Sequence, residues 1–444
     1  MDKTIAAVST PFGTGGIAVI RVSGKDAFSI CEKVFISKKK LSDVPSHTFV
    51  YGKIVKDGKT LDSCLCAVFR APNSFTGENT VEINCHGGIK ITSMVLDAVL
   101  SAGAEMAERG EFSKRAFVNG KLDLSEAEAV IDLINAKTEN AAQQAITQFE
   151  GGISGKIKNM RDSIAAVNAK ILAVIDFPDE EIDEFQTEEF KNILLEKKNE
   201  IQKLIDSFSV GKIYRSGLSV LLLGKTNAGK SSLLNRLINE NKAIVTDIAG
   251  TTRDVLEEYI DIKGVPVKLL DTAGIRNTDD IVENIGVERS KELINTADII
   301  VCVIDSSRPL DDDDKEIFNL ISDKKVIYIK NKSDLNCLAE TDFPCIEVSC
   351  KNGTGIDKLC DEIYLNAGVF KGDETVINNV RHKNCLEKAL NHINDAILGF
   401  TAGLPSDIVS IDLEGACMEL GNITGVLVSE ETVNHIFADF CVGK

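Results

Sequence analysis

The stretch that decides the fold of this chain is SVLLLGKTNAGKS, residues 219–231. Its second half fits the pattern GxxxxGK[ST], and it follows a hydrophobic strand and opens a helix, the context that a phosphate-binding loop requires. The glycines let main-chain N–H groups turn toward phosphate oxygens, and the helix N-terminus adds a favourable dipole. We therefore expect Lys230 to reach the β- and γ-phosphates of a nucleotide and Ser231 to ligate Mg²⁺.

Further motifs follow in the order that a GTP-binding domain needs. GTTRD (250–254) supplies hydroxyls for Mg²⁺ and the γ-phosphate, and DTAG (271–274) ends a strand with a carboxylate and a flexible glycine. NKSD (331–334) follows another strand, and SCK (349–351) would back the base. A carboxylate accepts hydrogen bonds only, so Asp334 can receive the N1 and N2 donors of guanine, a pair that adenine lacks. The motifs together predict that the nucleotide is GTP.

Apolar strands and helices alternate around these motifs and predict a parallel, doubly wound sheet within residues 216–370. We expect helices at Ser231–Asn239 and Glu316–Ser322, and we interpret Asp311–Asp314 only as a low-complexity run. The expected strands are Ser219–Leu223, Val265–Leu270, Ile299–Ile304, Val326–Ile329 and Ile346–Val348. The segment is thus predicted to be a Ras-like P-loop GTPase domain.

The residue directly after the DTAG motif differs from that of Ras-like enzymes. In Ras-like enzymes a Gln directly after the DTAG element orients the attacking water. Here that position is Ile275, which cannot do so. Another group, or a partner, must therefore polarise the water. The residues alone leave four candidates open, Arg276, Asp279, Asp280 and Glu283.

The segments on either side of the GTPase motifs differ from each other. Residues 1–120 are rich in short strand signals and predict an α+β domain. Residues 121–215 and 371–444 show apolar residues at helical spacing, and Ser125 with Glu128 fits a capping box. We expect one helical domain, made of both segments, into which the GTPase domain is inserted. The predicted N-terminal elements are strands Ile17–Val22, Thr48–Val55, Ser63–Phe69 and Val81–Asn84, and helices Asp26–Val34 and Ile89–Ser101.

Charge is distributed unevenly along the chain. The 444 residues carry a net charge of −18 and only 5% aromatic residues, with no Trp, which argues against a general nucleic-acid coat protein. Residues 1–120, however, hold 15 basic and 12 acidic residues, a net charge of +3. The acidity lies in the remaining segments, so a phosphate backbone would find its cations in the N-terminal domain or on a partner.

The cysteine pattern and the hydropathy predict a cytoplasmic protein. The twelve cysteines contain no CxxC pair and no regular framework. We also find no signal peptide and no apolar run of the roughly 18 residues that a spanning helix needs. A reducing cytoplasm without membrane insertion is the simplest prediction.

Beyond these motifs, the chain resembles the MnmE (TrmE) family of tRNA-modification GTPases along essentially its whole length. The segments outside the GTPase motifs make the resemblance specific, because many GTPases share the nucleotide motifs alone. They are TPFGTGGIAVIRVSG from Thr10, SFTGENTVEINCHGG from Ser74, GEFSKRAFVNGKLDLSEAEAV from Gly110, DFPDEE from Asp176 and the C-terminal FCVGK.

The resemblance implies a function that the residue patterns do not show. Members work with an FAD-containing flavoprotein (MnmG) to install an aminomethyl-type substituent on C5 of the wobble uridine of certain tRNAs. The N-terminal domain is similar to a folate-binding and dimerisation domain that presents a one-carbon tetrahydrofolate. The family's folate contacts fall on Arg21, Glu78, Lys121 and Lys444.

The resemblance also implies a potassium-dependent GTPase whose G domains pair across a homodimer. Mg²⁺ would be held by Ser231 and Thr252, and Glu283 would orient the attacking water. The family's terminal cysteine falls on Cys441, a candidate functional thiol with an open role. K⁺ would be held by Asn227, Thr246, Ile248 and Thr251.

The expected GTP-binding residues include Lys230, which with Glu283 is a candidate catalytic residue. In chain order they are Asn227, Ala228, Gly229, Lys230, Ser231, Ser232, Thr246, Asp247, Ile248, Ala249, Gly250, Thr251, Thr252, Asp271, Thr272, Ala273, Gly274, Asn331, Lys332, Asp334, Ser349, Cys350 and Lys351. Two other functions use the same motifs: a GTP-dependent RNA-binding or ribosome-assembly switch, and a scaffold that binds GTP without hydrolysing it.

Overall fold

The computed structural model describes residues 3–176, 184–241, 243–244, 258–271, 292–369, 375–426 and 428–444. The chain divides into two compact units, which are described separately. Unit 1 comprises residues 1–131, 149–168 and 414–444, and unit 2 comprises residues 132–148 and 169–413. This division differs from the four predicted segments, whose boundaries remain a prediction.

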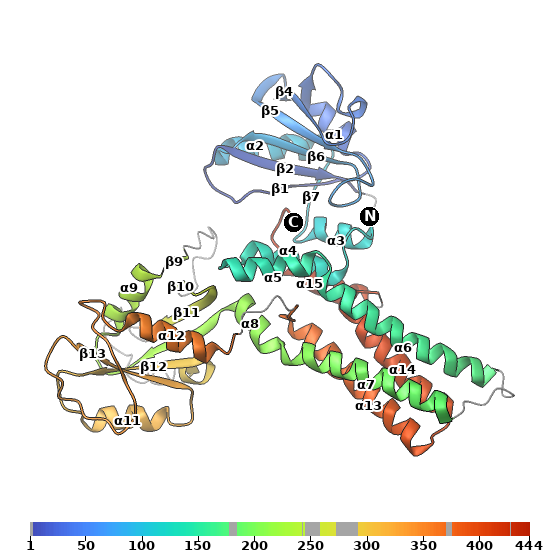
Figure 1. Ribbon diagram of the computed structural model, residues 1–444. Coiled ribbons are helices and arrows are strands. Elements are labelled where there is room, and N and C mark those ends of the chain that lie inside the picture. Colours follow the sequence, from blue (N-terminus) through green and yellow to red (C-terminus); the bar gives the residue numbers. More distant parts are fainter. Residues whose placement is uncertain are drawn as a thin grey trace. The chain divides into compact units, whose positions relative to one another are not determined.

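The N-terminal part of unit 1 is a seven-stranded sheet with the strand order β3-β4-β5-β6-β2-β1-β7 (Figure 1). Every neighbouring pair is antiparallel except β1 and β7. Helices α1 (Ala27–Val34) and α2 (Ile89–Ser101) pack on the sheet through one apolar core. The strands are β1 (Ile5–Val8), β2 (Ile17–Ser23), β3 (Phe35–Ser37), β4 (Thr48–Lys56), β5 (Lys59–Phe69), β6 (Thr80–His86) and β7 (Glu105–Met106).

The second sheet belongs to unit 2 and has the order β14-β13-β12-β8-β11-β10-β9. The first five strands are parallel, as predicted, but β10 and β9 are antiparallel neighbours at one edge. The predicted parallel, doubly wound sheet is therefore confirmed for its five expected strands. Strands β10 and β9 were not predicted; β10 is antiparallel to β11 because a hairpin at Lys263-Gly264, both with positive φ, returns the chain directly. The strands are β8 (Leu218–Leu223), β9 (Ala243–Ile244), β10 (Glu258–Ile262), β11 (Val265–Asp271), β12 (Ile299–Asp305), β13 (Val326–Asn331) and β14 (Ile346–Glu347).

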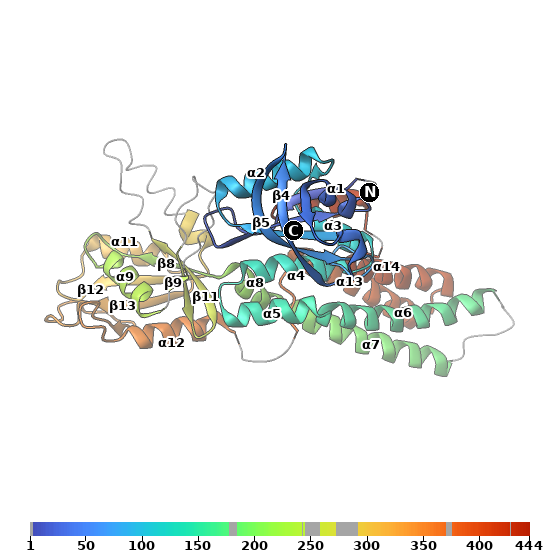
Figure 2. The ribbon, with the colours of Figure 1, turned by 90° about the horizontal axis from the view of Figure 1, so that it is seen from above.

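Helices cover both faces of this sheet, as a doubly wound fold requires. Alternate β8 residues divide between two cores: Val220 and Leu222 pack with α9 (Lys230–Glu240) and α12 (Ile356–Ala367), and Leu221 and Leu223 pack on the side of α11 (Asp312–Leu320). Figure 2 shows these helices around the sheet. The loop after β8 consequently lies at the carboxyl edge of the parallel strands, where ligands bind in open α/β sheets.

The remaining elements are helical, as the apolar spacing predicts. In unit 2, α7 and α13 pack along each other, with the Phe190 and Phe400 ring centroids 6.2 Å apart. Among the described residues, no helix is both long and apolar enough to cross a membrane. The helices are α3 (Glu111–Val118), α4 (Leu124–Asn135), α5 (Glu139–Phe149), α6 (Gly152–Asp176), α7 (Glu184–Asp206), α8 (Phe208–Ser216), α13 (Val380–Ala402), α14 (Ser406–Thr424) and α15 (Glu430–Ala438).

The capping box of α4 lies two residues before the predicted one. The Asp123 N–H donates to the Glu126 carboxylate, and the Glu126 N–H donates to the Asp123 carboxylate, each at 2.8 Å. The predicted pair Ser125 and Glu128 is wrong, because both residues lie inside the helix and are buried. Two overlapping patterns compete here, and the earlier one satisfies the free donors at the helix start.

This geometry predicts the effect of Asp123→Ala on stability. The substitution removes the acceptor of the Glu126 N–H, so the free energy of unfolding should fall by about 1 kcal/mol. Urea denaturation of the full chain, followed by the helical circular dichroism signal, measures the change. Asp162→Ala, an exposed acidic position within α6, is the control and should change stability by less than about 0.5 kcal/mol. Equal effects of both substitutions would contradict the assignment.

Candidate nucleotide site and N-terminal cluster

The loop between β8 and α9 has the backbone geometry of a phosphate cradle. Gly224, Asn227 and Gly229 all have positive φ, at 149°, 66° and 97°. A side chain at Gly229 would collide with the Asn331 amide, so this position accepts only glycine. Helix α9 begins at Lys230 directly after the loop, and its first turn carries no acidic side chain. The positive φ angles and the helix start together give the backbone conformation in which main-chain N–H groups and a helix N-terminus can meet an anion.

The Lys230 side chain is folded back over this loop. Its Nζ donates to the carbonyl oxygens of Gly224 and Lys225, both at 2.8 Å. These bonds fix the ammonium group beside the loop N–H groups, where it can meet phosphate oxygens. Ser231 follows it and is exposed, so its hydroxyl is accessible to an ion.

Asn331, at the end of β13, joins three of the predicted motifs. Its side chain is 2% exposed, its Nδ2 donates to the Ala228 carbonyl at 2.8 Å, and its Oδ1 accepts from the Cys350 N–H at 3.4 Å. The structure thus brings the loop at 224–231, the NKSD motif and the SCK motif into one site.

Asp334 is held as a hydrogen-bond acceptor at this site. The Ser349 hydroxyl donates to its carboxylate at 2.7 Å, which lowers the pKa of Asp334 below its ordinary value. The carboxyl group is therefore ionised at neutral pH, the form that accepts both guanine donors. Ser349 itself is fixed by an N–H bond of 2.9 Å to the Thr354 carbonyl.

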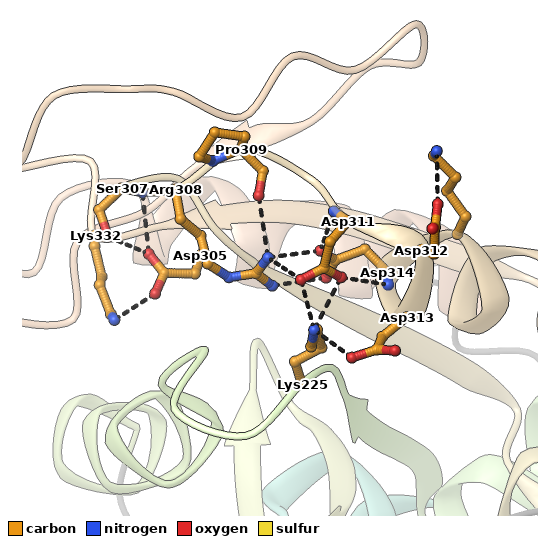
Figure 3. A network of polar contacts seen from close by, with 11 residues as sticks. Lys225, Asp305, Ser307, Arg308, Pro309, Asp311, Asp312, Asp313, Asp314 and Lys332 are labelled. Carbon is orange, nitrogen blue, oxygen red and sulfur yellow. Dashed lines mark hydrogen bonds and ion pairs between the residues drawn. The ribbon is translucent and has the colours of Figure 1, made fainter.

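Two lysines of the nucleotide motifs are anchored to the segment after β12 (Figure 3). Lys332 lies 2.6 Å from Asp305; burial alone would raise the pKa of this carboxyl group, but hydrogen bonds from Lys332 and Ser307 lower it. Lys225 lies 2.7 Å from Asp311 and 2.6 Å from Asp313. The Lys225 ammonium holds the pKa of Asp311 at about 2.

The same acidic run begins α11. Asp311 and Asp314 form a capping box, and Arg308 contacts the Asp314 carboxylate at 2.8 and 2.9 Å. The run read from sequence as low-complexity is thus a helix start that also holds the phosphate loop through Lys225. The sequence contained a signal for this role, because acidic residues at a helix start favour its dipole.

Some predicted site residues lie outside the described residues or are described only in part. Asp271 ends β11, paired in register with Leu222 of β8. The predicted residues outside the described ranges are Thr246, Asp247, Ile248, Ala249, Gly250, Thr251, Thr252, Thr272, Ala273, Gly274 and Glu283.

Unit 1 contains the second candidate site, built around Arg21 of β2. The Arg21 guanidinium donates to Glu82 of the neighbouring strand at 2.9 Å. It also lies over the rings of Phe75 and Phe112, at 5.4 and 5.6 Å from their centroids. Glu82 is a site residue that sequence reasoning missed, although its position opposite Arg21 follows from strand register.

Glu78 is fixed by a buried arginine. Arg115 of α3 is 2% exposed and contacts the Glu78 carboxylate at 3.0 Å and Glu111 at 2.8 Å. The Ser23 hydroxyl also donates to Glu78, at 2.8 Å. The carboxylate is therefore firmly oriented, and Arg115 is a second residue that sequence reasoning missed.

The C-terminal tail brings Lys444 to the same unit. The Phe112 N–H donates to the Lys444 carbonyl at 3.2 Å, and the Ser9 hydroxyl donates to Gly443. Burial and the nearby Arg21 charge lower the pKa of Lys444. Lys121 is exposed, and its methylenes lie beside Gly77. Cys441, the predicted functional thiol, is exposed in this tail.

Two protein-family models match nearly the whole chain. A model of the MnmE helical domain matches residues 124–441, and a model of the TrmE N-terminus, described as a GTP-binding protein, matches residues 4–121. The tRNA modification GTPase MnmE of Acetivibrio thermocellus is 44% identical over 456 residues, 100% of this chain and 99% of the relative. The same-named protein of Carboxydothermus hydrogenoformans is 46% identical over 461 residues, 100% of each. The chain belongs to the MnmE family of tRNA modification GTPases.

This membership confirms the family resemblance and the multidomain fold with a P-loop GTPase domain. The MnmE-family chain is an enzyme that hydrolyses GTP. Its similarity to a solved structure of Aquifex aeolicus Era is low: 24% identity over 39% of this chain and 66% of Era, with a TM-score of 0.27.

The anchoring of Lys225 predicts a measurable effect on nucleotide binding. Lys225→Ala should raise the dissociation constant for GDP about two- to tenfold, since the loop loses both ion pairs to the acidic run and exposed pairs each contribute little. Fluorescence titration with a labelled guanine nucleotide measures it. Lys315→Ala, which removes an exposed Asp312 pair on α11, is the matched control and should leave affinity unchanged. The anchoring role is wrong if both variants bind GDP equally well.

Proposed function

We propose that this GTPase works with a flavoprotein partner to attach an aminomethyl-type group to C5 of the wobble uridine of certain tRNAs. A one-carbon tetrahydrofolate would supply the added carbon. The observation that carries the proposal is the convergence of Arg21 and Lys444 in unit 1, beside the Phe75 and Phe112 rings. Family membership supports the same function.

This cluster fits the chemistry of a reduced folate. Folates combine a flat, polar pterin with carboxylates on a glutamate tail. Arg21, Lys121 and Lys444 supply cations for the carboxylates, and the Glu78 side chain supplies acceptors for pterin N–H groups. Arg115 orients Glu78, so the acceptor direction exists before binding.

The nucleotide site would hydrolyse GTP mainly by positioning and charge stabilisation. Lys230 holds its ammonium group against the β- and γ-phosphates. Ser231 and Thr252 would hold Mg²⁺, which when bound neutralises phosphate charge. Glu283 replaces the missing Gln by accepting a hydrogen bond from the attacking water. K⁺ would be held by Asn227, Thr246, Ile248 and Thr251. Its positive charge would take the place of the charge that an arginine finger supplies in other GTPases.

The proposed assembly is a homodimer joined through the N-terminal domains, in which the G domains pair when GTP and K⁺ are bound. An FAD-containing flavoprotein and tRNA would join it in the cytoplasm. Hydrolysis would then switch the complex between conformations. We assign Cys441 no chemical step, since its exposure fits a contact in the tail as well as a nucleophile.

The alternative is a GTP-dependent RNA-binding or ribosome-assembly switch without modification chemistry. It would need the nucleotide site but not the Arg21 cluster. Binding of a reduced folate to the purified protein separates the two functions, because the alternative predicts none. Arg21→Ala should abolish that binding, while Arg70→Ala, another part-buried arginine of the same domain that also lies over a phenylalanine ring, should not.

The proposed function predicts a specific change in cellular tRNA. A strain that lacks this gene should lose the C5-modified wobble uridine, because nothing would present the one-carbon unit. Mass spectrometry of digested tRNA nucleosides measures the loss, and complementation with the wild-type gene should restore the nucleoside. Complementation with Asp334→Asn should fail, since that variant cannot hold guanine. An unchanged nucleoside profile would contradict the proposed function.

The missing Gln predicts a cation-dependent GTPase. Turnover should be about tenfold or more faster in K⁺ than in Na⁺ at equal ionic strength, a fraction of the 10³–10⁵ that an arginine finger gives. Glu283→Ala should lower turnover and leave nucleotide affinity nearly intact. Asp279→Ala and Asp280→Ala are the matched controls and should leave turnover nearly unchanged. Equal rates in both salts would remove K⁺ from the mechanism, and lost binding would give Glu283 a structural role.

A further inference from the structure

The positive charge of the N-terminal domain is concentrated in one short segment. Residues 33–60 contain seven lysines and two aspartates, a net charge of +5, although residues 1–120 together reach only +3. Outside this segment the first 120 residues are therefore net acidic. The segment covers β3, β4 and the first residues of β5.

The sheet places these lysines along its edge. Strand β3 is the outermost strand of the order β3-β4-β5, so one side of it has no neighbour in the sheet among the residues that the structure describes. Lys38, Lys39 and Lys40 follow β3 directly. Lys53 of β4 lies opposite Ile36 of β3. Lys59 begins β5, the third strand, and lies opposite Lys56 at the end of β4, so the lysines extend from the end of β3 to the β4–β5 turn.

Five of these lysines are exposed and available, namely Lys38, Lys39, Lys40, Lys53 and Lys59. In the part of the chain that the structure describes, none of the five forms an ion pair. The other two are engaged: Lys56 contacts Asp97, and Lys33 donates to the Ala102 carbonyl. We call the five available residues the lysine edge.

Acidic groups near the lysine edge are few and partly engaged. Glu32 accepts a hydrogen bond from the Ser42 N–H at 2.7 Å. Asp43 lies in the short 3₁₀ helix Leu41–Asp43, and Asp57 lies in the β4–β5 turn with a positive φ of 51°. The edge therefore keeps a net positive charge.

Two aromatic side chains share the outward face of β4 with Lys53. Phe49 is 63% exposed and Tyr51 is 66% exposed, and both alternate with the buried Val50 and Ile54 positions. Exposed aromatic rings on a sheet stack unpaired bases, and adjacent cations hold the phosphates between them. An unpaired loop of RNA presents both groups together.

The length of the edge suits a nucleic-acid strand. From Gly52, opposite Ser37, to Lys56, opposite Lys59, β4 rises roughly 13 Å at about 3.3 Å per residue. A stretch of this length can face several consecutive phosphates of one nucleic-acid strand, because the backbone charges are closely spaced.

We propose that the lysine edge is the surface of this chain that binds the phosphate backbone of tRNA, with Phe49 and Tyr51 beside it for unpaired bases. The inference rests on the proposed function, which makes tRNA the substrate. It places the RNA contact on a positive surface of a chain whose net charge is −18.

The test compares two full-length variants that lose the same charge. In the edge variant, Lys38, Lys39, Lys40, Lys53 and Lys59 are all replaced by Gln. In the control variant, five exposed lysines elsewhere are replaced by Gln, namely Lys156, Lys158, Lys203, Lys315 and Lys358. Fluorescence anisotropy measures binding of a labelled tRNA transcript with uridine at the wobble position, over a salt series.

The wild type and the control variant should bind this tRNA alike. The edge variant should bind about tenfold or more weakly at about 0.1 M salt. Its slope of log affinity against log salt should flatten by about two or more, since each lost phosphate contact removes about 0.7–0.9. Basal GTP turnover should be the same for all three proteins, because no substituted residue belongs to the nucleotide site.

Other outcomes would contradict either the lysine edge or the proposed function. Equal tRNA binding by all three proteins, or equal loss in both variants, overturns the lysine edge. A changed oligomeric state of the edge variant in analytical ultracentrifugation also overturns it, since the edge would then join two copies of the chain. If the wild type itself binds no tRNA, the tRNA part of the proposed function fails instead.

Discussion

The buried amide of Asn331 is the interaction on which the nucleotide site depends. It connects the phosphate loop, through the Ala228 carbonyl, with the base-backing segment, through the Cys350 N–H. A buried amide left without its partners is unfavourable by about 1–3 kcal/mol, so the two loops are held at one fixed separation. Gly229 is part of the same constraint, because only a residue without Cβ lets the amide approach.

Ion pairs surround the uncharged Asn331 contact and hold the loops that would contact the nucleotide. The segment after β12 anchors Lys332 through Asp305 and Lys225 through Asp311 and Asp313. Most of these groups are only partly buried, so each pair contributes little to stability by itself. Their effect is to restrict long side chains and loops before the nucleotide arrives, which lowers the entropy lost on binding.

Sequence patterns predicted the strands that apolar runs define. They mostly missed elements and site residues that depend on contacts between distant parts of the chain. Strands such as Val265–Asp271 were predicted within a residue, because unbroken apolar runs before loop motifs have few alternatives. Strand β10 was missed, since its pairing depends on a hairpin and a sheet edge. Arg115 was missed as a site residue because its partners Glu78 and Lys3 lie far from it in sequence. Ser125 was misread because Asp123 offers a competing cap.

Net charge predicts little about which surface can meet RNA, because paired charges no longer attract a polyanion. Around the phosphate loop, Lys225 is neutralised by Asp311 and Asp313, and Arg308 by Asp314. A phosphate backbone arriving there would meet carboxylates whose cations are already engaged. The lysine edge differs because its ammonium groups have no such partners in the described chain, and solvent counterions alone are displaced when phosphates bind. The two surfaces therefore differ less in net charge than in whether their cations already have acidic partners. The GTP-binding surface has paired cations, and the lysine edge has cations that can bind tRNA.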